Sequence, residues 1–136
     1  MIKPIKIILA FMLVAELFVS CKKDEQAPEL VPPKAENIEI GYANNKQAIR
    51  GRDFHFNADL LAGDKIESVQ VKILPKAGQG YTSSWKMEIA WDEFKGLKNA
   101  NIHKHFTIPL EAPEGKFDFF FIVNDANGSK LELKED

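Results

Sequence analysis

Alternating apolar and polar residues near the C-terminus predict a β-hairpin. The apolar positions of its first strand recur every second residue, at Phe117, Phe119, Phe121 and Val123. This period of two places them on one face of a strand. The polar run 124–128 supplies residues that tolerate a tight turn, and the alternation resumes at Leu131 and Leu133. We therefore expect residues 114–133 to form a hairpin at the centre of a small β-structure.

The same two-residue period predicts five further strands, at residues 38–40, 53–60, 66–74, 85–91 and 102–108. Inward-facing side chains are expected at Phe54, Phe56, Ala58 and Leu60, at Val69, Val71 and Ile73, and at Trp85, Met87, Ile89 and Trp91. Residues 92–98 are expected to form one helical turn. Short strands separated by turn signals are typical of an all-β, immunoglobulin-like β-sandwich of about seven antiparallel strands. The phase of the strand 102–108 turns Lys104 toward the core, which is unusual for a charged side chain.

The N-terminal segment has the features of a bacterial lipoprotein signal peptide. Two lysines precede an apolar run over residues 7–19, which at about 1.5 Å per residue is too short to cross a bilayer. The run ends at Ser20 and Cys21, and residues 17–21 (LFVSC) resemble a lipobox. We therefore expect residues 1–20 to be removed and Cys21 to carry the lipid, with more than one acyl chain for stable membrane anchoring. The alternative is an ordinary signal peptide followed by an unmodified cysteine.

Residues 21–34 then form the predicted tether, and residues 35–136 the folded domain. Pro28, Pro32 and Pro33 favour an extended tether with a reach of roughly 40 Å. Acidic residues soon after the cysteine resemble a signal that sends lipoproteins to the outer surface of the outer membrane, although Lys22 and Lys23 precede them here. The expected location is the cell envelope, at the outer membrane.

Composition narrows the functional classes. The chain has 136 residues, a net charge of -2 and a single cysteine, so it lacks the basic excess of a nucleic-acid-binding protein and cannot form an internal disulfide. No nucleophile motif and no glycine-rich phosphate-binding loop occurs in the sequence. We therefore expect a binding or accessory module rather than an enzyme.

Several segments, taken in order, resemble a known family. They are Pro28-Glu29, 51–55 (GRDFH), Trp85, 94–99 (FKGLKN), 102–109 (IHKHFTIP), 112–117 (APEGKF) and 123–128 (VNDANG). Together they are similar to the Bacteroidetes lipoprotein family catalogued as domain of unknown function 4625. The resemblance implies an immunoglobulin-like domain and assigns no activity. The chain departs from the family at Phe117-Asp118, where members often carry an aromatic residue followed by histidine.

The three histidines form a candidate metal site. His103 and His105 lie two apart on one predicted strand, so both side chains project from the same face. His55 lies on the polar face of the strand 53–60, and in an immunoglobulin-like sandwich these two strands are neighbours. With Asp59 nearby, three imidazoles and a carboxylate would suit zinc or copper. The alternative is three solvated histidines on a polar face.

Aromatic and apolar residues offer two further candidate contacts. Tyr81, in a glycine-containing loop, is a candidate for ligand contact, and exposed aromatics of this kind would suit a glycan. Phe120 and Ile122 lie on the face of their strand opposite the core residues, where they would suit a protein partner or a cover formed by the tether. A glycan-binding accessory lipoprotein is thus a further alternative.

Overall fold

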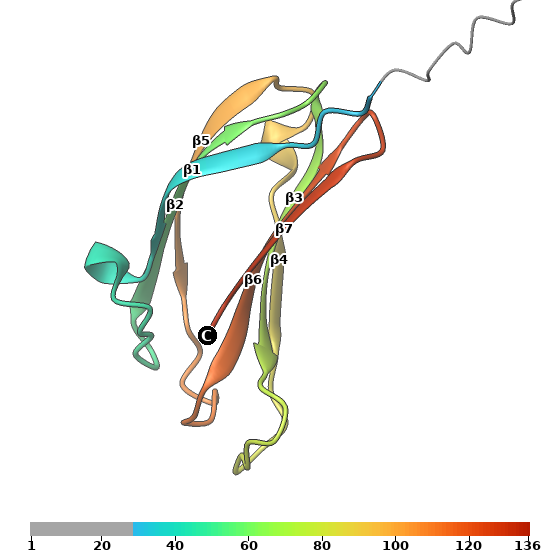
Figure 1. Ribbon diagram of the computed structural model, residues 1–136. Coiled ribbons are helices and arrows are strands. Elements are labelled where there is room, and N and C mark those ends of the chain that lie inside the picture. Colours follow the sequence, from blue (N-terminus) through green and yellow to red (C-terminus); the bar gives the residue numbers. More distant parts are fainter. Residues whose placement is uncertain (1–28) are drawn as a thin grey trace, which may run out of the picture.

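The computed structural model describes residues 29–136 and shows two antiparallel sheets packed face to face (Figure 1). The predicted signal peptide, Cys21 and the tether up to residue 28 lie outside the described residues. Within residues 29–136, no helix combines the length and apolar character needed to cross a membrane.

Seven strands make up the sandwich, and the expected all-β fold is confirmed. The strands are β1 (Lys34–Ile40), β2 (Asp53–Leu61), β3 (Ile66–Pro75), β4 (Met87–Ala90), β5 (Asn99–Thr107), β6 (Phe117–Asp125) and β7 (Lys130–Glu135). Two short 3-10 helices, η1 (Tyr42–Asn44) and η2 (Asp92–Phe94), lie in the connections. The strand order is β1-β2-β5 in one sheet and β4-β3-β6-β7 in the other. The fourth strand therefore pairs with the third, whereas constant-type immunoglobulin domains place it beside the fifth.

The core lies between the sheets and follows the alternation of the sequence. Its most deeply buried large side chains are Phe56, Phe121, Ile66, Ile102, Val69, Val71 and Val123. The buried apolar residues span Ile40 to Val123 and come from both sheets. Every strand and this whole core lie within residues 34–135, so the protein from Lys22 onward keeps the complete sandwich.

The fourth strand is shorter than the pattern predicted. It pairs with β3 only from Met87 to Ala90, so Trp85 and Trp91 flank the strand instead of belonging to it. Continuing the register by two residues would place Trp85 opposite Pro75, which has no N–H to donate to a ladder. Both indoles still pack against the core, as expected.

Lys104 faces inward at the edge of its sheet, where η2 covers it. Its ammonium pairs with the carboxylate of Glu93 and lies 5.8 Å from the centre of the Trp91 ring and 5.2 Å from that of Phe94. A paired charge over aromatic faces is compatible with partial burial. The predicted phase of the strand is therefore correct, and the unusual lysine has local partners.

The chain enters the sandwich at the end where two turns meet. The carbonyl oxygen of Val31 accepts hydrogen bonds from Nδ2 of Asn127 at 2.9 Å and from Oγ of Ser129 at 3.3 Å. The same carbonyl oxygen lies close to Gly63, because a Cβ atom at residue 63 would be only 1.7 Å from that oxygen. Residues just before β1 are thus held against the turns that follow β2 and β6.

Candidate functional site

Strand pairing brings the three histidines together on the outer face of the β1-β2-β5 sheet. His55 on β2 lies directly opposite His105 on β5, and His103 lies opposite Asn57, two residues further along β2. Because alternate residues of a strand share a face, all three imidazoles project from the same side. We call His55, His103 and His105 the histidine cluster.

The ring nitrogens of the histidine cluster converge. Nδ1 of His55 lies 3.3 Å from Nε2 of His105, and the latter lies 3.2 Å from Nε2 of His103. One nitrogen from each ring falls within 4.8 Å of the others. In a tetrahedral zinc site with Zn–N bonds of about 2.0–2.1 Å, two ligand nitrogens lie about 3.3–3.4 Å apart. Two of the three spacings therefore already match those of a metal centre.

Carboxylates contact the outer nitrogens of two of these rings. Oδ2 of Asp53 lies 2.5 Å from Nδ1 of His105, and Oε2 of Glu39 lies 3.5 Å from Nε2 of His55. A carboxylate that accepts the N–H of a ligating histidine fixes its tautomer and orients the ring toward the metal. Asp53 would thus hold Nε2 of His105 free of a proton and directed at the other two rings.

Asp59 is not among the residues whose ligand atoms converge with the histidine cluster. Asp59 lies four residues along β2 from His55, which is roughly 13 Å in an extended strand. Its carboxylate instead accepts hydrogen bonds from Nδ2 of Asn37 at 2.7 Å and from Nδ2 of Asn101 at 2.8 Å. These bonds hold the pKa of Asp59 below its ordinary value. The carboxylates that contact rings of the histidine cluster are those of Asp53 and Glu39, neither of which was predicted.

Tyr81 links two loops. Its hydroxyl accepts the N–H of Lys76 at 2.8 Å and donates to the carbonyl oxygen of Lys116. Its ring packs against Phe117 with centroids 4.9 Å apart and fills the space beside Gly115. Ligand contact by Tyr81 stays a prediction, while its evident contribution is to the structure of this end of the domain.

Phe120 and Ile122 lie on the outer face of the β4-β3-β6-β7 sheet, as predicted. Both are half-buried rather than openly exposed, because long polar side chains flank them on the neighbouring strands. Phe120 lies between Lys72 and Lys134 in the register, and the ammonium of Lys134 is 5.8 Å from the centre of its ring. Their half-burial weakens the case for an apolar partner surface.

Trp85 and Trp91 pack against other aromatic side chains, so they add no support for a glycan site. Trp91 stacks on Phe56 with centroids 6.1 Å apart, and Trp85 meets Phe117 edge to face at 5.3 Å. A stacking platform for sugars needs aromatic faces that are free to contact the ligand. These two side chains pack within the protein instead.

Comparison with known families then identifies the group to which the chain belongs. Residues 19–136 match the family described as Domain of unknown function (DUF4625). The chain is a DUF4625 protein. No curated protein matches it. The description of the DUF4625 family assigns no activity to its members.

Proposed function

We propose that this DUF4625 protein is a lipid-anchored binding module of the cell envelope whose ligand is a zinc or copper ion. The observation that carries the proposal is the convergence of three imidazole nitrogens within 4.8 Å, backed by Asp53. Three nitrogen ligands suit zinc and copper, and the solvent-exposed side of His103 and His105 leaves room for a fourth ligand. We assign the site a binding role because the sequence holds no nucleophile motif and no glycine-rich phosphate-binding loop.

Thermal unfolding of the domain from Lys22 onward, with and without the metal, tests this proposal. Zinc or copper at about 100 times its dissociation constant should stabilise the fold by about 2.7 kcal/mol, a rise of about 10 °C in the unfolding temperature. Replacing His103 and His105 together with alanine should abolish the rise. Asn57→Ala, on the same face, is the matched control and should keep it.

A graded variant separates a metal site from loose association with surface histidines. Asp53→Asn leaves all three imidazoles in place but removes the carboxylate that orients His105, so metal affinity should fall about 10- to 100-fold. Isothermal titration at neutral pH measures this loss. Wild-type protein that binds neither metal, or a histidine double variant that binds as tightly as wild type, would sink the proposal.

The lipid anchor is a second part of the proposal and rests on residues 17–21 (LFVSC), with Cys21 the only cysteine in the chain. Changing Cys21 to alanine should abolish incorporation of radiolabelled palmitate and release the protein from the membrane fraction. Lys22→Ala, which leaves the cysteine in place, should be labelled like wild type. Palmitate labelling that persists in the Cys21 variant would contradict lipidation at this residue.

A further inference from the structure

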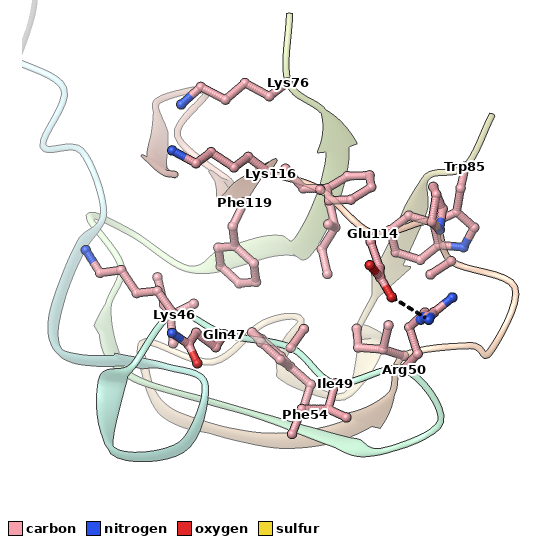
Figure 2. Close-up of a pocket in the computed structure, with 18 of the residues that line it drawn as sticks. Lys46, Gln47, Ile49, Arg50, Phe54, Lys76, Trp85, Glu114, Lys116 and Phe119 are labelled. Carbon is pink, nitrogen blue, oxygen red and sulfur yellow. Dashed lines mark hydrogen bonds and ion pairs between the residues drawn. The ribbon is translucent and has the colours of Figure 1, made fainter. Parts of the chain in front are cut away.

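A groove of about 1060 Å3 opens between the two sheets at the end opposite the entry of the chain. It is bounded by the loop 45–50, by the loop 110–117 and by the ends of β3 and β7. Figure 2 shows side chains of both loops around it, together with Lys76 just after the end of β3. Sites for small molecules commonly enclose about 300–1,000 Å3, so this groove has room for a ligand of substantial size. The histidine cluster lies on the outer face of one sheet and takes no part in the groove.

The floor of the groove is apolar. It consists of the outermost side chains of the core, which are Ile40, Phe54, Ile73, Ile108 and Phe119. Two large apolar residues on its rim, Ile49 and Leu110, are 68% and 74% exposed. An apolar ligand that covers exposed side chains of this size removes their surface from water, which favours binding. The floor and rim thus suit an aliphatic body.

The charged lining of the groove carries both signs, with three lysines and one arginine beside two glutamates and one aspartate. Figure 2 shows the extended side chains of Lys46, Lys76 and Lys116 at one side of the cavity, with Trp85 and the Arg50–Glu114 ion pair at the other. Two of the three lysines already form ion pairs with carboxylates of the protein itself. Lys46 pairs with Glu135 at 2.5 Å, and Lys76 pairs with Asp136. Lys116 forms no ion pair with any residue in 29–136, which leaves its charge available to a ligand.

We propose that the groove binds an amphiphilic anion, with its aliphatic chain on the apolar floor and its carboxylate at Lys116. The carboxylates of Glu135 and Asp136 show that the lysine side of the groove accepts this kind of group. A glycan is a poorer match, because the five floor side chains carry no polar atom for hydrogen bonding with sugar hydroxyls. The groove shares no residue with the histidine cluster, so each of the two binding proposals can be refuted without affecting the other.

The test uses cis-parinaric acid, a long-chain carboxylate whose fluorescence rises in apolar surroundings, titrated into the domain from Lys22 onward. We expect a saturable rise that dodecanoate reverses by competition, and we expect dodecanol, with the same chain and no charge, to compete less well. Lys116→Glu should weaken binding about tenfold, the effect of placing a like charge beside the ligand carboxylate. Leu110→Asp should also weaken binding of the probe, because it replaces an apolar side chain on the rim with a carboxylate.

Controls locate the binding. Lys65→Glu makes the same charge change at the opposite end of the sandwich and should leave the affinity unchanged. Replacing His103 and His105 with alanine should also leave it unchanged. The proposal is overturned by a probe that does not saturate, by dodecanol competing as well as dodecanoate, or by affinities that Lys116→Glu and Leu110→Asp leave intact in protein whose unfolding temperature shows it to be folded.

Discussion

Replacing Phe56 with alanine is expected to lower the free energy of unfolding by about 3–5 kcal/mol. Phe56 is completely buried, and its ring contacts Trp91 together with Phe119 and Phe121 from the opposite sheet. Removing the ring loses these contacts and leaves a cavity at the point where the two sheets meet. Since a domain of this size is stable by about 5–15 kcal/mol, the loss is a large part of the total. Urea titration followed by tryptophan fluorescence measures it.

Phe120→Ala is the matched control for this experiment. It removes the same ring from β6, but on the outer face, where the ring is half-buried between lysine side chains. Its cost should be well below that of the Phe56 change. If both variants lost the same free energy of unfolding, Phe56 would not be a core residue as described.

Asp125→Asn is expected to destabilise the domain by roughly 2–3 kcal/mol. The side chain is 3% exposed, and its oxygens accept hydrogen bonds of 2.6–3.1 Å from the backbone N–H groups of Gly63, Asp64 and Asn127. The carboxylate therefore joins the turn after β2 to the turn after β6. An asparagine of the same shape keeps one acceptor oxygen and puts an NH2 group among donors, which leaves N–H groups unsatisfied.

The contribution of Asp125 should depend on pH. Burial raises the pKa of this carboxyl, but the backbone hydrogen bonds outweigh it and hold the pKa below its ordinary value. A lowered pKa in the folded state means that the ionised form stabilises the fold. The stability that ionised Asp125 contributes is fully present above the ordinary aspartate pKa of about 3.9. It is lost as the pH falls through the lowered pKa of Asp125 in the folded state.

Thermal unfolding of wild type and Asp125→Asn across this acidic range measures the effect, and the difference between them should shrink as the pH falls. Asp64→Asn removes a neighbouring exposed carboxylate and serves as the control, with little expected change at neutral pH. A difference between wild type and the Asp125 variant that stays constant into strong acid would contradict the linkage.

Much of this fold could be predicted because burial repeats with the period of a strand. Phe54, Phe56, Ala58 and Leu60 were expected to face inward on β2, and all four are buried. Knowing that β2 and β5 are neighbours also predicted that the three histidines would meet. The length of β4 could not be predicted in the same way, because Trp85 and Trp91 continue its alternation and only the partner strand ends its pairing.

The carboxylates of the site depend on details that a single sequence does not encode locally. Asp53 and Asp59 both share the outer face of β2 with His55, and only the register with β5 decides which of them meets His105. Glu39 reaches His55 because β1 has an irregularity between Glu36 and Glu39, where Asn37 has a φ of 50°. The one available signal was that Asp53 is two residues from His55, whereas Asp59 is four.

The groove depends on how the sheets separate at one end, and no alternation of residues encodes that separation. Its lining comes from the loop 45–50, the loop 110–117 and the C-terminal residues, which lie far apart in the sequence. Exposed apolar residues in two of these loops, Ile49 and Leu110, were a usable hint once the loops were known to face each other.

Opposite placement of the chain entry and the groove has a mechanical consequence. The described chain enters the sandwich at the end opposite the loops 45–50 and 110–117 (Figure 1), and these loops bound the groove. A pull between the N-terminus and a molecule held in the groove would act along the strands. Because β1 is antiparallel to β2 and runs from the entry toward the groove, such a pull shears the β1–β2 ladder. Its hydrogen bonds would share the load instead of opening one after another, which slows forced unfolding, a process set by the unfolding rate.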